Sequence, residues 1–243
     1  MAGRLPNIHQ SLSVNQITLI REFLVSKFPK HALIVRTLNE KTDTTYIQNL
    51  ITENFRLIGS RQVYLIDNNA LEKFTLKKPR DVKKDEYLLT DKDITIINYE
   101  KKSLIIDEQI QQLYHNLYLE KHSSLNPDYT TQFFSLIQST PGFKTKLIYN
   151  NQQLIGFLGY MVKNEIIYAP FLGYNPQNPE NKDSYRMISA IKIQAAQKGG
   201  WTLHSSAGAS SFKLNRGHSP VIEYHALYIR KRQTNPIYTT QLT

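Results

Sequence analysis

Two side chains that could accept a proton, Glu223 and His225, lie near the end of this 243-residue chain. They are two residues apart on a predicted strand, so both point to one face, about 7 Å apart along the strand. Either could take a proton from a nucleophile, directly or through a water molecule. Glu223 is our first candidate for a general base, although a salt bridge to Lys213 or Arg216 would explain it equally well.

Other candidate side chains flank these two in the sequence. Lys213 and Arg216 place cations on a loop, and arginine suits a bidentate contact with a phosphate or carboxylate. Tyr185 and Arg186 fall in the first turn of a predicted helix, where the phenol could act as an acid and the guanidinium could meet an anion. The alternatives are an ordinary exposed basic loop and a helix turn that packs on a sheet edge.

The segment 205–211 reads SSAGASS. Its small side chains would let backbone amides approach a ligand, so Ser205 and Ser206 are candidate binding residues, although close packing against a neighbouring strand explains them equally well. The segment lacks the Gly-x-Ser-x-Gly elbow of hydrolases. The seven histidines show no zinc-binding spacing, so no metal site is predicted.

A helix is predicted from residue 184 to 198, with a cap at Asp183 or Ser184 and an end at Gly199-Gly200. A loop that begins at Gly173-Tyr174 connects it to an apolar strand. A strand, a loop and a helix N-terminus in this order can offer free amides to an anion, and Tyr174 is a further candidate binding residue. An ordinary crossover helix remains the alternative.

Composition favours a folded protein: 40% of the residues are hydrophobic, and there are 15 tyrosines and 10 phenylalanines. No apolar run is long enough to cross a bilayer, and the first ten residues lack the apolar core of a secretory signal, so a cytosolic location is expected. The absence of cysteine excludes disulfides, a thiol nucleophile and thiolate metal sites.

The net charge is +10, and from residue 183 onward eight basic residues stand against two acidic ones. Such a field favours an anionic ligand, such as a nucleotide-like cofactor, an acidic substrate, a nucleic acid or an anionic membrane surface. A basic surface without a partner is the alternative.

Apolar periodicity predicts helices at 13–28 and 43–54 and strands at 31–38 and 55–67. Turn chemistry at 67–69 makes the strand before it the first arm of a predicted hairpin. The segment 73–92 carries charges of both signs, so we predict an exposed connector and place a domain boundary at residue 92.

After this boundary, the pattern predicts a strand at 93–99, helices at 107–120 and 128–138, and three strands between 144 and 169 that form an antiparallel meander. The helix at 184–198, a short strand, a short helix or turn and a last strand follow.

Several segments resemble a bacterial branch of the GNAT acyltransferase superfamily, the GNAT-like N-acetyltransferases related to the Fem peptidoglycan-bridge transferases. They are YAPFLGY at 168–174, SYRM at 184–187, HSSAGA at 204–209, Phe212-Lys213, Arg216-Gly217 and Glu223-Tyr224. The similarity is clearest over 107–232 and touches Lys121-His122-Ser123. It implies an α+β fold with a mixed, mostly antiparallel splayed sheet flanked by helices, in which residues 93–243 form the acyltransferase domain and residues 1–92 a partial GNAT-like half-domain.

The resemblance also implies a function, the transfer of an acyl group, in the first instance acetyl, from acyl-CoA to an amine of a small molecule or peptide. Glu223 or His225 would then be the base and Tyr185 the acid for the departing thiolate. Two alternatives stay open: Fem-like transfer from an aminoacyl-tRNA, and a non-catalytic module that binds nucleic acid or another anion. Where well-studied GNAT enzymes carry Gln/Arg-x-x-Gly-x-Gly/Ala, this chain reads NPENKDSY, and 107–138 is too short for the long helical arm of Fem transferases.

Overall fold

The computed structural model describes residues 11–100, 103–179 and 182–230. The described residues form two compact units, a large unit of residues 63–220 and a small unit of residues 11–62 and 221–230. Four residues of the patterns above, Glu180, Asn181, Lys231 and Arg232, lie outside the described ranges. The division does not follow the boundary expected at residue 92, because the last strand returns to pair with the first.

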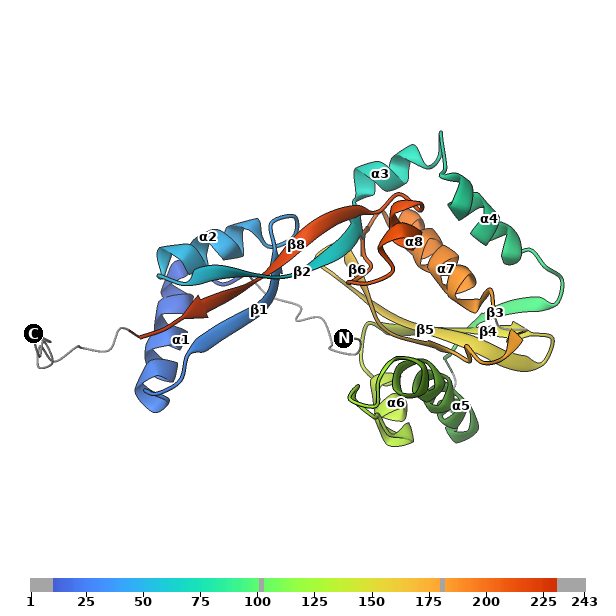
Figure 1. The fold of residues 1–243 in the computed structure, drawn as a ribbon, viewed down its shortest axis with the longest axis horizontal. Coiled ribbons are helices and arrows are strands. Elements are labelled where there is room, and N and C mark those ends of the chain that lie inside the picture. Colours follow the sequence, from blue (N-terminus) through green and yellow to red (C-terminus); the bar gives the residue numbers. More distant parts are fainter. Residues whose placement is uncertain (1–10, 101–102, 180–181, 231–243) are drawn as a thin grey trace, which may run out of the picture. The chain divides into compact units, whose positions relative to one another are not determined.

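The sheet of the large unit runs in the order β2-β7-β6-β5-β4-β3 (Figure 1). The strands are β2 (Arg56–Ile66), β3 (Ile94–Asn98), β4 (Phe143–Asn150), β5 (Gln153–Lys163), β6 (Ile166–Tyr174) and β7 (Thr202–His204). β4, β5 and β6 pair antiparallel in sequence order, so the predicted meander is confirmed. β6 and β7 are parallel, which makes the sheet mixed but mostly antiparallel, as predicted.

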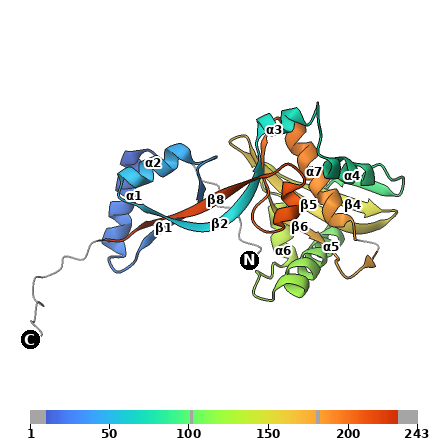
Figure 2. The same ribbon diagram turned by 45° about the horizontal axis from the view of Figure 1, so that its top comes forward.

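Helices cover both faces of this sheet (Figures 1 and 2). On one face lie α5 (Leu104–His115), the π-helix η1 (Asn116–His122) and α6 (Thr131–Ile137); on the other lie α3 (Asn68–Lys73), α4 (Arg80–Leu88) and α7 (Ser184–Gly199). The first face buries Tyr114, Phe134 and Phe171, and the second buries Ile188 and Ile191. Because both faces are covered, every residue of β5 from 154 to 160 is buried.

The small unit contains α1 (Val14–Lys27), α2 (Thr44–Thr52) and the strand order β1-β8-β2, where β1 is Leu33–Asn39 and β8 is Ser219–Tyr228. Ser13 caps α1 with the capping-box partner Gln16. Ile47 and Leu50 of α2 are buried against Leu38 of β1. β2 and β8 each contribute residues to both units.

β6 and β7 part after three residue pairs. Ile166 pairs with Thr202, Ile167 with Leu203 and Tyr168 with His204, and β7 ends there. β6 continues to Tyr174, so its second half has no paired strand on the β7 side in the described part of the chain. The parting lies beside α7, which follows the fourth strand counted from β3. The splayed sheet implied by the resemblance is therefore present.

Two local predictions were wrong. Asp67 does not begin a hairpin turn: its carboxylate accepts a hydrogen bond from the Ala70 amide at 2.8 Å and caps α3. Aspartate serves turns and helix caps through the same side-chain acceptor, so the residue type could not separate them. The segment 73–92 is not an exposed connector either, because it contains α4, whose Val82 and Asp85 are buried.

In the described ranges, no helix is long and apolar enough to cross a membrane.

Candidate functional site

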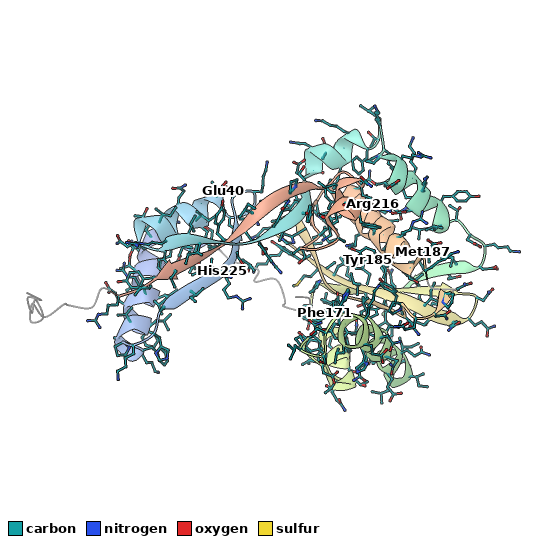
Figure 3. The ribbon with its side chains drawn as sticks, viewed as in Figure 1. Glu40, Phe171, Tyr185, Met187, Arg216 and His225 are labelled. Atoms are coloured by element: carbon teal, nitrogen blue, oxygen red, sulfur yellow. The ribbon has the colours of Figure 1, made fainter. Side chains whose placement is uncertain are left out.

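The predicted site residues are divided between the two units. Seven lie in the large unit, namely Tyr174, Tyr185, Arg186, Ser205, Ser206, Lys213 and Arg216. Glu223 and His225 lie in the small unit. Figure 3 labels Tyr185, Arg216 and His225 among the side chains.

An aromatic row lies beside the unpaired half of β6. Tyr174 ends this strand, Tyr185 occupies the first turn of α7, and Phe212 comes from α8 (Ser210–Leu214). The ring centroids of Tyr174 and Tyr185 are 6.2 Å apart, and those of Tyr185 and Phe212 are 4.7 Å apart. Two predicted site residues, Tyr174 and Tyr185, therefore lie together beside the unpaired half of β6.

Burial raises the pKa of Tyr185, and Tyr174 raises it further, whereas the cation of Arg216 acts in the opposite direction. The phenol is therefore protonated at neutral pH and can donate a proton or a hydrogen bond. Tyr118, on η1, also has a raised pKa because of burial, with contributions from both of these tyrosines.

Lys121 is a residue that the site prediction missed. Its Nζ lies 3.5 Å from the Tyr174 hydroxyl and 5.6 Å from the centroid of the Tyr174 ring. It stands in η1, in a segment where an ordinary helix was expected to end. The only signal in the sequence was the resemblance at Lys121-His122-Ser123.

The two predicted arginines both bind one buried carboxylate. Asp85 of α4 accepts from Arg186 Nε at 2.8 Å and from Arg216 Nε and Nη2 at 2.5 and 3.1 Å. Asp85 is 1% exposed and Arg216 is 5% exposed. Arg186 also donates to Asp183 at 2.7 Å. The guanidiniums thus join α4 to α7 and to the end of α8, and no sequence pattern had pointed to Asp85.

Lys213 is buried too, with 4% exposure, and its ammonium donates to three consecutive carbonyls. The acceptors are the backbone oxygens of Ser205, Ser206 and Ala207, at 2.6, 3.0 and 2.8 Å. A lysine ammonium has three donors, so this side chain organises the loop after β7.

His218 holds the same loop from the other side. Its Nδ1 lies 3.0 Å from the Lys213 carbonyl and its Nε2 lies 2.8 Å from Ser205 Oγ. Burial and the cation of Lys192 lower the pKa of His218 to about 3. The imidazole is neutral, so Nδ1 donates to the carbonyl, and Nε2 accepts from the Ser205 hydroxyl.

In the small unit, Glu223 is buried and its Oε2 accepts from Arg61 Nε at 2.5 Å. Arg61 of β2 is thus an ion-pair partner of Glu223 that the sequence had not suggested. His225 Nδ1 accepts from the Thr37 amide at 3.4 Å, and its Nε2 lies 3.1 Å from Ser60 Oγ.

The first turn of α7 has two features that suit an anion. Asp183, the residue before the helix, makes no side-chain hydrogen bond to the first-turn amides. The Ser184 hydroxyl is fully buried and has no hydrogen-bond partner among the described residues. Free amides at a helix N-terminus carry a partial positive charge.

A depression of about 280 Å³ is lined by residues of α5, of η1, of β5 and the turn before it, and of the loop that leads to α7. Its lining residues carry carboxamides or are leucines, and none is charged. They are Gln109, Gln112, Leu113, Asn116, Gln152, Gln153, Leu154, Asn175 and Asn178. Among the residues that the structure describes, no three His, Asp or Glu side chains are grouped so that they could hold a metal ion.

Comparison with known proteins agrees with this fold. No family model matches the sequence. No curated protein matches it either. Three solved structures are similar over most of their length. FemX matches with a TM-score of 0.64 and 8% sequence identity, over 95% of this chain and 83% of that chain. L-PGS from Bacillus licheniformis has a TM-score of 0.66 and 14% identity, over 90% of this chain and 75% of that chain, and the C-terminal DUF2156 domain of a proposed lysylphosphatidylglycerol synthetase from Agrobacterium fabrum has a TM-score of 0.65 and 11% identity, over 88% and 74%.

At these identities the likeness concerns the fold alone. The chain therefore has the splayed, mostly antiparallel GNAT-like fold that the resemblance implied, and it shares this fold with FemX.

Proposed function

We propose that this chain is an acyltransferase that moves an acyl group, acetyl in the first instance, from acyl-CoA to an amine of a small molecule or peptide. The observation that carries the proposal is the parting of β6 from β7 after Tyr168, beside the first turn of α7. An unpaired strand edge offers backbone donors and acceptors to a ligand that lies along it. The amide-containing arm of acyl-CoA is such a ligand.

The phosphates of the donor would meet the N-terminus of α7. The uncapped amides and the Ser184 hydroxyl can donate to an anion there. Arg186 is tied to Asp85 and Asp183, so we assign the anion contact to the backbone first and to this guanidinium second. Lys121, beside Tyr174, adds a positive charge near the same strand end.

The proposed reaction has four coupled changes. The amine nitrogen bonds to the thioester carbonyl carbon, the carbon–sulfur bond breaks, a base takes the proton from the amine, and an acid protonates the thiolate. Tyr185 is the proposed acid, since its phenol is protonated and lies beside the unpaired edge of β6. Glu223 is the proposed base, with His225 as the second candidate.

A second function is favoured by the structural similarity to the C-terminal domain of a proposed lysylphosphatidylglycerol synthetase. The name of that activity denotes a lysyl group joined to phosphatidylglycerol. Transfer of an aminoacyl group from a charged tRNA would use the same carbonyl chemistry, with an ester in place of the thioester. The net charge of +10 suits either donor, because both are polyanions.

The donor can be tested by thermal unfolding of the full chain with CoA, acetyl-CoA, a long-chain acyl-CoA and lysyl-tRNA. A ligand at 100 times its dissociation constant adds about 2.7 kcal/mol of stability. We expect acetyl-CoA to raise the melting temperature. A shift with lysyl-tRNA alone would select the second function, and no shift with any of the four would contradict both.

The base can be tested with Glu223→Gln. We expect the variant to bind the donor normally and to lose turnover, because the amide cannot take the proton. Glu53→Gln is the matched control, since Glu53 is another ion-paired carboxylate of the small unit, partly buried and 2.7 Å from Arg21. An equal loss in both variants would mean that turnover depends on the ion pairs of the small unit, and not on a base at Glu223.

A further inference from the structure

The loop after β7 has an unusual electrostatic arrangement. The carbonyls of Ser205, Ser206 and Ala207 all accept from the buried Lys213 ammonium, at 2.6, 3.0 and 2.8 Å. Lys213 is 4% exposed, whereas Gly208 is exposed at the surface of the loop. One buried charge therefore contacts three successive peptide groups from the inside.

A trans peptide group is planar, and its N–H points opposite to its C=O. The amides that belong to the three bound carbonyls are those of Ser206, Ala207 and Gly208. They point away from Lys213. The Ser206 amide donates to His204 Nδ1 at 3.2 Å, but the amides of Ala207 and Gly208 have no acceptor among the residues that the structure describes.

The space outside Gly208 is open. A Cβ built on this glycine would meet nothing within 4 Å, and its φ of +78° disfavours any side chain. The loop begins directly after His204, the last residue of β7, where this strand and β6 part. Two outward-pointing amides therefore lie close in the chain to the place where we put the acyl donor.

A hydrogen bond to a carbonyl polarises the whole peptide group and makes its N–H a stronger donor, and the effect is larger for a charged partner. Fixed backbone donors that point to a developing negative charge are a major source of catalysis in acyl transfer. Lys213 itself cannot serve, because its three donors already bind carbonyls and its side chain is buried.

We propose that the amides of Ala207 and Gly208 bind the oxyanion of the tetrahedral intermediate, with Lys213 as the positioning residue that polarises them. The negative charge forms on the carbonyl oxygen when the amine bonds to the carbonyl carbon, and it returns to the carbon–oxygen bond when the carbon–sulfur bond breaks. This role rests on the proposed function. The polarisation of the Ala207 and Gly208 amides by Lys213 does not depend on that function.

The sharpest test replaces a single amide by an ester in the full chain. An ester at residue 208, with glycolic acid in place of glycine, removes that N–H and keeps the shape of the loop. We expect kcat to fall about 100-fold with KM unchanged, the usual cost of one lost oxyanion donor.

The matched control is an ester at residue 206. It weakens the carbonyl of Ser205, a Lys213 acceptor, just as the ester at 208 weakens the carbonyl of Ala207, but the N–H that it removes points to His204. We expect this control to keep most of its turnover. Equal losses in both variants, or no loss at residue 208, would overturn the inference.

A second measurement does not depend on activity. Inorganic phosphate is titrated into the isotope-labelled protein, and the amide resonances are followed by NMR. The amide protons of Ala207 and Gly208 should move downfield in a saturable way, and those of Gly142, another exposed glycine with positive φ and open surroundings, should not. Lys213→Met should weaken the response.

The two proposals can fail separately. If no donor or acceptor supports turnover and the phosphate response remains, the proposed function is wrong and the amide site stands. If turnover is found but the two loop amides do not respond to phosphate, or respond equally in Lys213→Met, the inference is wrong and the transferase stands.

Discussion

Tyr185 is held beside the unpaired edge of β6 by its aromatic neighbours. Phe212 and Tyr174 lie within 4.7 and 6.2 Å of its ring centroid, and no residue that the structure describes makes a hydrogen bond to its hydroxyl. The ring is therefore fixed while the hydroxyl is available for another partner. A proton donor in an active site needs this combination of a fixed ring and a free donor.

We predict that Tyr185→Phe keeps the fold and lowers kcat by about 100-fold or more, because an acid catalyst is lost while the ring packing is kept. The pH–rate profile of the wild type should fall only above the ordinary tyrosine range, since the pKa of Tyr185 is raised and the active form is the protonated one. That alkaline limb should be missing in the variant. Tyr87→Phe, at an exposed tyrosine of α4, is the control and should leave both properties unchanged.

The lowered pKa of His218 should make the stability of the fold depend on pH. The pKa of the buried imidazole is lowered from 6.5 to about 3, first by burial and then by the cations of Lys192, Lys213 and Arg216. Below about pH 6.5 the unfolded chain therefore binds a proton at this residue, whereas the folded chain binds it only near pH 3. The stability contribution is present above this pH window and is lost as the pH falls through it.

The loss should amount to about 3 kcal/mol between pH 6.5 and about pH 4, at about 1.4 kcal/mol for each pKa unit. Urea unfolding at a series of pH values measures it. His218→Gln is expected to be less stable at neutral pH, because the bond to Ser205 changes, but to show a flatter acid limb. An unchanged acid limb would mean that His218 titrates normally.

Helix α4 is joined to α7 and to the end of α8 through one carboxylate. Asp85 binds both Arg186 and Arg216, and the guanidinium carbon of Arg216 lies 3.3 Å from the Phe212 ring centroid. Phe212 in turn contacts Tyr185. Helix α4, which lies in the segment predicted as a connector, thus holds the arginine that packs on Phe212 of the aromatic row.

We predict that Asp85→Asn lowers the free energy of unfolding by about 3 kcal/mol or more, because it removes the nearest and fully buried counter-charge of Arg216. Asp81→Asn is the matched control on the same helix. Its carboxylate lies 3.7 Å from Arg216 Nη1 but is partly exposed, so the loss there should stay below about 1 kcal/mol. Urea unfolding compares the two, and similar losses would contradict this account of α4.

The chain does not divide into consecutive halves. β2 and β8 run through both compact units, and the core of the large unit includes Ile66, Leu71 and Val82. A fragment that starts at residue 93 lacks these three side chains and the strand β2 that pairs with β7.

We predict that a fragment of residues 93–243 does not fold cooperatively, although the sequence resemblance is strongest there. The missing strand would expose the β7 edge and part of the apolar core to water. Circular dichroism during thermal unfolding, with the full chain as the reference, measures this. A sharp transition in the fragment would support the boundary expected at residue 92.

Elements that depend on local chemistry could be predicted from the sequence. The helix α1, the helix α7 with its end at Gly200 and the meander β4-β5-β6 all follow from caps, periodicity and turn residues. Tyr174 and Tyr185 could be proposed together because the strand and the helix that carry them are consecutive in the chain. The splay itself came only through the resemblance, since no periodicity shows where two parallel strands stop pairing.

Tertiary structure alone decided the partners of the charged side chains. Glu223 meets Arg61, which is 162 residues away, and Arg216 meets Asp85, which is 131 residues away. Lys213 faces the carbonyls of its own loop. The amino-acid sequence determines which groups carry charge and which local turns they follow, but the partner of a buried charge depends on the elements that fold over it. This pairing decides whether a cation binds a ligand or holds the protein together.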